Sequence, residues 1–186
     1  MRSRSLATLI LAVLSGAPLG LQAQDAPPYG LGRPATPQEL AGWDIDVRAD
    51  GQGLPPGSGS VRDGMKVYAE RCGACHGDKG EGNPMDRLAG GAGTLASPNP
   101  VRTVGSFWPY ATTLFDYVRR AMPFNAPQSL TADQIYAVCA YLLYLNQIVP
   151  AEAVMDAQTL PKVQMPNRNG FTFPDPRPDV PRRPPP

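Results

Sequence analysis

Cys72-Gly73-Ala74-Cys75-His76 is the stretch on which the fold of this chain depends. The spacing Cys-x-x-Cys-His is typical of covalent attachment of a c-type haem, in which two thiols react with the vinyl groups of one porphyrin. The histidine that follows can bind the iron as the proximal axial ligand. His76 is the single histidine among 186 residues and the motif occurs once, so the sequence predicts one haem c held through Cys72 and Cys75.

Three other interpretations of the two cysteines fit the sequence less well than haem attachment. A structural zinc site needs about four ligands, and only Cys139 remains to join the motif. A thioredoxin-like dithiol follows a strand of a βαβ unit, whereas residues 61–71 before this motif have helical character. A disulfide within the motif would close a small, strained ring. The sequence therefore favours haem.

The N-terminus has the features of a secretory signal peptide, predicted over residues 1–23. Two arginines precede a short apolar stretch at residues 6–14, and Ala23 follows as the expected cleavage point. The apolar stretch is shorter than the roughly 20 residues that a membrane span needs. We therefore expect an exported, periplasmic protein without a membrane span.

Composition indicates a compact core with long irregular segments, because 23 prolines and 19 glycines are many for this length. The net charge of +1 is close to zero, which argues against nucleic acid or an anionic membrane surface as a partner. After the signal peptide we expect an extended N-terminal arm and linker over residues 24–59. A haem domain is expected over residues 60–149, and a Pro-rich C-terminal extension over 150–186.

A helix is predicted directly before the motif, and a long loop directly after it. Ser60 is a suitable N-cap for a helix from Val61 to Arg71. Residues 77–100 contain six glycines and three prolines and show no helical or strand periodicity. A loop of this length is usually functional or disordered, and we expect this one to wrap the porphyrin.

Two further helices are predicted toward the C-terminal side of the haem domain. Thr112 or Thr113 can cap a helix over residues 114–121, which ends before a Met-Pro pair. A capping box of Thr131 and Gln134 opens a helix from residue 132 to about 147. Its apolar stripe contains Cys139, which is expected to be an inert buried residue.

Outside this region the patterns are weaker. Residues 43–47 alternate like a short strand, and Trp43 and Ile45 are expected to cover the core as part of an extended arm. Asp156 can cap one helical turn that Pro161 ends. Residues 174–186 contain seven prolines and are expected to be extended or disordered.

The haem iron needs a second axial ligand or keeps an open site, and methionine is the common alternative to histidine. The methionines left after export are Met65, Met85, Met122, Met155 and Met165. Met122 stands at a helix end beside a proline that would hold it rigidly, so it is our predicted ligand, with core filling as the alternative. Trp108 and Arg102 could contact haem propionates, although core packing and a solvated surface explain them equally well.

With these features in place, the chain resembles class I cytochromes c over residues 60–149. The resemblance implies an all-α fold, with three to four helices around one covalent haem and irregular Pro/Gly-rich N- and C-terminal extensions. It places Cys72, Cys75, His76 and Met122 at the haem-binding positions. It places Gly64, Tyr68 and Tyr141 where the first helix of the family crosses the last.

Three stretches extend the resemblance. They are Gly-Leu-Pro-Pro-Gly at 53–57, the segment from Thr103 to Tyr117, and Met-Pro-Asn-Arg-Asn-Gly-Phe at 165–171. They are similar to the cytochrome subunit of the periplasmic sulfane/sulfite dehydrogenase of thiosulfate-oxidising bacteria. The partners so implied are a molybdopterin dehydrogenase subunit and a downstream cytochrome or oxidase. Some relatives carry a second haem domain, whereas this sequence has one haem motif.

The resulting hypothesis is an electron-transfer subunit that is not catalytic on its own. The first alternative is a free soluble electron shuttle to a terminal oxidase. The second is a haem enzyme with an open distal site, in which Tyr110 or Arg102 would be the nearby acid–base candidates.

Overall fold

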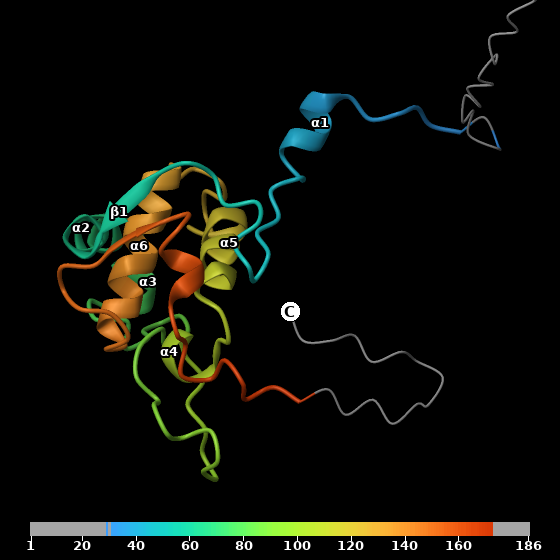
Figure 1. Cartoon of the computed structure of the whole chain (residues 1–186). Coiled ribbons are helices and arrows are strands. Elements are labelled where there is room, and N and C mark those ends of the chain that lie inside the picture. The colour runs from blue at the N-terminus through green and yellow to red at the C-terminus, as the bar shows by residue number, and fades with distance from the viewer. Residues whose placement is uncertain (1–28, 30, 173–186) are drawn as a thin grey trace, which may run out of the picture. The chain divides into compact units, whose positions relative to one another are not determined.

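The computed structural model describes residue 29 and residues 31–172 (Figure 1). The chain divides into two compact units, Met1–Thr36 and Pro37–Pro186. All the helices and strands of the described residues belong to the second unit. The predicted signal peptide and the proline-rich residues 174–186 lie outside the described residues.

Helix α6 (Ala132–Leu145) is the centre of the second unit. It contacts α2 (Val61–Arg71), α5 (Ala111–Ala121) and α4 (Val104–Phe107), and it lies between α2 and α5 in Figure 1. Nine consecutive residues of α6, from Ile135 to Leu143, are buried. A helix buried on nearly all sides is almost uniformly apolar, and the sequence of α6 has this character.

The starts of α2 and α6 confirm the predicted caps. The Ser60 hydroxyl accepts a hydrogen bond from the Asp63 backbone N–H at 3.1 Å, which satisfies one free donor at the start of α2. Both reciprocal bonds of the capping box between Thr131 and Gln134 are present at the start of α6. The end of α6 falls two residues before the predicted position, at Leu145.

The crossing of α2 and α6 depends on a glycine. A Cβ atom on Gly64 would lie 2.5 Å from the carbonyl carbon of Ala137 and 2.8 Å from the Cβ of Tyr141, so no larger residue fits without displacement. One turn later the rings of Tyr68 and Tyr141 pack with centroids 5.2 Å apart. The predicted contact of a glycine and aromatic residues between these helices is confirmed.

A small sheet adds to the helices. Strand β1 (Ser58–Ser60) pairs antiparallel with β2 (Val154–Asp156), with Gly59 opposite Met155. Strands of three residues are too short to show a period of two, which is why the sequence did not predict them. The fold is otherwise mostly helical, as expected for a class I cytochrome c, and the sheet fastens residues after 150 to the haem domain.

Residues assigned to the C-terminal extension take part in the core. The buried ones are Met155, Leu160, Val163 and Met165. The Asp156 carboxylate accepts hydrogen bonds from the N–H groups of Gln158 and Thr159, both at 2.8 Å, so it caps a turn as predicted. The expectation that Pro161 ends this turn is wrong. The proline lies inside a short 3-10 helix (Leu160–Lys162), near its start, where its missing N–H costs nothing.

The start of α5 corrects a second prediction. The helix begins at Ala111 and its N-cap is Tyr110, so neither Thr112 nor Thr113 is the cap. Thr112 is buried, and its hydroxyl donates to the Ala49 carbonyl oxygen at 3.2 Å. Its side chain therefore joins the helix to the N-terminal arm. The end of α5 at Ala121, before Met122, agrees with the prediction.

The N-terminal arm contains a short helix, α1 (Pro37–Ala41), and no strand in residues 43–47. Ile45 is buried as expected, but the expectation that Trp43 covers the core is wrong, since 80% of its surface is exposed. The arm is held through Val47, whose backbone N–H donates to the Asp116 carboxylate on α5 at 3.0 Å.

Candidate haem-binding site

Helix α2 runs directly into the Cys-x-x-Cys-His motif. The N–H of Cys72 closes the last turn of α2 on the Tyr68 carbonyl oxygen at 2.8 Å, and α3 (Gly73–His76) adds one further turn. The chain then turns at Gly77, whose φ of +80° favours glycine. The Tyr68 hydroxyl donates to the Gly77 carbonyl oxygen at 2.8 Å, so the motif is fastened at both of its ends to one tyrosine.

The two thiols of the motif are free and differ in exposure. Cys72 is partly buried and Cys75 is exposed. Removal from water raises the pKa of the Cys72 thiol to about 11, so this group stays protonated at neutral pH. Cys139 is fully buried in α6, as predicted, and the same desolvation raises its pKa.

The ring of His76 is oriented by the loop that follows it. Its Nδ1 lies 2.8 Å from the Asp86 carbonyl oxygen, an acceptor, so Nδ1 carries the proton and Nε2 keeps its lone pair for a metal. Backbone bonds from Gly82 to His76 and from Met85 to Cys75 fold the loop against the motif. Sequence reasoning missed Asp86, because a backbone carbonyl leaves no signal in residue identity.

The loop over residues 77–100 contains no helix or strand, as predicted, but it is held by specific bonds. Asn146, at the end of α6, accepts from the Gly90 N–H at 3.0 Å and donates to the Leu88 carbonyl oxygen at 3.1 Å. Thr103 adds a hydroxyl bond to the Gly90 carbonyl oxygen at 2.6 Å. Asn146 was not identified from the sequence, where it looks like an ordinary residue at a helix end.

The other predicted site residues come from the segment between the loop and α6. Met122 is the C-cap of α5. It is partly buried and packs against the core, and Cys72 and Trp108 are partly buried against the same core. The Trp108 ring packs edge-on against Tyr117, with centroids 5.6 Å apart. These three side chains therefore border the same core, and the ligand and propionate roles stay predictions.

Arg102 lies in the segment directly before α4. It is exposed, and its guanidinium carbon is 5.3 Å from the centroid of the Phe107 ring. This is a cation–π contact at the surface. The predicted contact with a propionate stays untested.

Residues 61–146 match the model of the cytochrome c family. The structure is also similar to a chain of the sulfane dehydrogenase SoxCD from Paracoccus pantotrophus, with a TM-score of 0.73 and 48% sequence identity. That match covers 78% of this chain and 72% of the SoxCD chain.

The chain belongs to the cytochrome c family. A comparison with curated proteins gives no match. Membership confirms the predicted class I cytochrome c fold and implies a covalently attached haem c. Within the described residues of this cytochrome c, no helix has the length and apolar character needed to cross a membrane.

The residues present fit that haem. Two unpaired thiols lie within one helical turn, as thioether formation to a single porphyrin requires. The adjacent imidazole has its Nδ1 fixed and its Nε2 available. In residue 29 and residues 31–172, no group of three or more His, Cys, Asp and Glu side chains could hold a metal ion. The two thiols and the imidazole are the donors that a haem c uses.

Proposed function

We propose that this cytochrome c is the haem subunit of a periplasmic, molybdenum-containing sulfane or sulfite dehydrogenase that acts in sulfur oxidation. It would take single electrons from the dehydrogenase subunit and pass them to a downstream cytochrome or oxidase. The observation that carries the proposal is the 48% identity to a SoxCD chain over 78% of this one. Identity at this level, over most of the chain, supports a shared partner as well as a shared fold.

The haem supplies one-electron redox chemistry when it is bound. Cys72 and Cys75 would hold it covalently, and His76 and Met122 would be the axial ligands. The hydrogen bond from His76 to the Asp86 carbonyl keeps the imidazole in one tautomer and one orientation. If both His76 and Met122 held the iron, no position would remain for a substrate, which makes a carrier the better proposal than an enzyme with an open distal site.

A periplasmic location is part of the proposal and is supported by the signal peptide features of residues 1–23. An exported, unfolded chain would present both thiols of the motif for haem attachment before α2 and α6 pack. Metal-binding and electron-transfer properties of the folded protein would then appear only outside the cytoplasmic membrane.

The experiment is native purification from the periplasm of the source, with haem absorbance followed through each step. We expect a larger, molybdenum-containing subunit to co-elute in a fixed ratio, and the haem to be reduced when sulfite or a sulfane-sulfur substrate is added. A haem protein that elutes alone and is not reduced by sulfur compounds would contradict the proposal and favour the free electron shuttle.

A further inference from the structure

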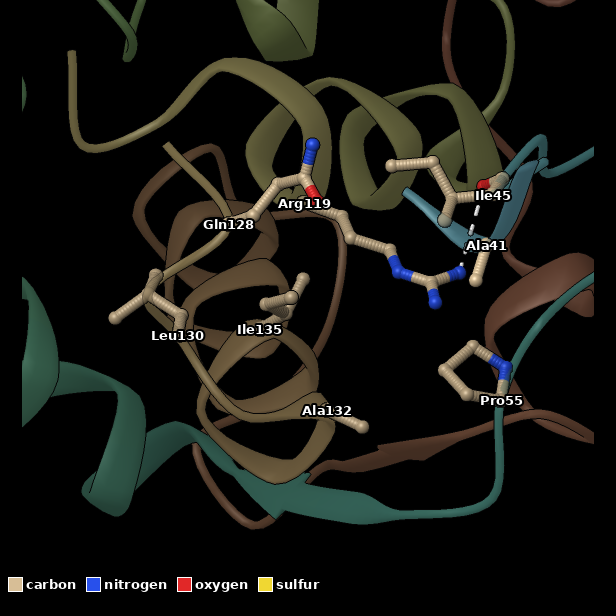
Figure 2. Close-up of a pocket in the computed structure, with 8 residues that line it drawn as sticks. All are labelled: Ala41, Ile45, Pro55, Arg119, Gln128, Leu130, Ala132 and Ile135. Carbon is tan, nitrogen blue, oxygen red and sulfur yellow. Dashed lines mark hydrogen bonds between the residues drawn. The ribbon is translucent and has the colours of Figure 1, made fainter. Parts of the chain in front are cut away.

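A cavity of about 250 Å³ lies beside the N-terminal arm, α5 and α6 (Figure 2). Ile45 and Pro55, from the chain before β1, form one side of it, and Leu130 and Ile135 form another. These four side chains are apolar, whereas Gln128 and Arg119 add polar groups to the lining. The side chain of Arg119 extends from α5 across this space, and its guanidinium group lies near Ile45 and Pro55 in Figure 2.

Arg119 differs from the arginine next to it in its partners. Arg120 forms ion pairs with Asp46 at 2.7 Å and with Asp116 at 3.1 Å. Arg119 donates one long hydrogen bond, at 3.4 Å, to the Ile45 carbonyl oxygen. No carboxylate of the described residues lies within ion-pair distance of its guanidinium. A guanidinium group has five N–H donors, so a partly buried Arg119 keeps most of its capacity for an anion.

The arm beside the cavity presents exposed apolar side chains. Leu40 is 52% exposed and Trp43 is 80% exposed, and each lies within two residues of a cavity wall. This part of the arm is held by the bonds of Asp46 and Val47 to α5. Tryptophan and arginine are among the residues most enriched in the hot spots of protein–protein interfaces. Because the arm is already fixed to α5, it loses little conformational entropy when a partner binds.

We propose that this cavity receives the carboxylate of a Glu or Asp side chain from the dehydrogenase subunit. The carboxylate pairs with the Arg119 guanidinium, and the methylene groups of the same side chain lie against Ile45 and Ile135. Leu40 and Trp43 pack on the surrounding surface of that subunit. Charge complementarity determines the choice of occupant, because a pocket that combines apolar side chains with a cation lacking an ion-pair partner favours a residue that has both a short aliphatic part and a negative charge. The inference rests on the proposed function, which supplies the partner.

The test measures the affinity of holo-cytochrome variants for the purified dehydrogenase subunit by titration. We expect Arg119→Gln to weaken binding about thirtyfold or more, since truncating a buried, hydrogen-bonded charge pair has an effect of this order. Trp43→Ser should weaken binding about tenfold, and it removes a side chain that is 80% exposed. Arg62→Gln, at an exposed position on α2, is the matched control and should bind as wild type does. The haem spectrum should be unchanged in all three.

A photo-crosslinking amino acid in place of Ala41, a residue of the cavity wall, identifies the occupant. A crosslink to a segment of the dehydrogenase subunit that contains Glu or Asp supports the inference. A crosslink to a second copy, or to another part of this chain, overturns it. Wild-type affinity in both Arg119→Gln and Trp43→Ser also overturns it while leaving the proposed function intact. If wild-type protein neither binds the dehydrogenase nor is reduced through it, the proposed function fails and the inference fails with it.

Discussion

Gly64→Ala is the substitution that most directly tests how the two central helices pack. The added methyl carbon would lie 2.5 Å from the Ala137 carbonyl carbon and 2.8 Å from the Tyr141 Cβ. Carbon atoms pack best at about 3.5–4.0 Å, so α2 and α6 must move apart by at least about 1 Å, and the Ala137 carbonyl oxygen lies closer still. The obstructing atoms are backbone and Cβ atoms, which cannot rotate away, and the separation also disturbs the Tyr68–Tyr141 ring contact.

The free energy of this change has two opposing terms. Overpacking a close-packed contact costs roughly 1–3 kcal/mol, and a clash with backbone belongs near the upper value. Alanine in place of glycine stabilises a helix by roughly 0.5–1 kcal/mol. We therefore expect Gly64→Ala to lower the free energy of unfolding by about 2 kcal/mol. Without the clash, the same substitution would stabilise the protein, so the sign of the effect is informative.

The assay is guanidinium chloride unfolding of the holoprotein, followed by far-UV circular dichroism. Gly42→Ala is the matched control, because Gly42 has an ordinary φ and a Cβ there would have no neighbour within 4 Å. The control should be within about 0.5 kcal/mol of wild type, as surface substitutions generally are. A Gly64→Ala protein as stable as the control would refute the close crossing of α2 and α6.

Three further expectations concern the iron ligand, alkaline stability and the N-terminal arm. Reduced Met122→Ala protein should bind carbon monoxide while reduced wild type does not; equal behaviour of the two would mean that another residue is the ligand. Burial raises the pKa of Tyr136 from 10.0 to about 12, so its contribution to stability should be complete below pH 10 and lost between pH 10 and about 12. Tyr136→Phe, which also removes the hydroxyl bond to the Pro55 carbonyl oxygen, should therefore show a smaller alkaline loss in denaturant unfolding, and an unchanged loss would assign it to other groups. Asp116→Ala removes the acceptor of the Val47 amide, whose hydrogen exchange should become about tenfold faster, and an unaltered rate would show that the arm is held by other contacts.

Local chemistry made several features of this protein predictable from the sequence. Caps such as Ser60 and Thr131 act within a few residues, so their residue types are sufficient to place the starts of α2 and α6. The start of α5 was misplaced because Thr112, a good cap in isolation, is drawn into a long-range bond to Ala49. Trp43 was misplaced for a related reason, since apolar character alone does not say whether a side chain faces the core or a partner.

The sequence by itself determined the haem motif, the existence of the three main helices and the glycine on the face of α2 that meets α6, because each depends on short-range spacing. Only the tertiary structure decided how the motif is supported: the carbonyl of Asp86 at the His76 ring and Asn146 across the loop are contacts between residues distant in sequence or made by backbone atoms. The same holds for the uncompensated guanidinium of Arg119. The next residue, Arg120, is also an arginine, but it forms ion pairs with Asp46 and Asp116. The two side chains leave α5 in different directions, and for this reason only Arg119 reaches the cavity.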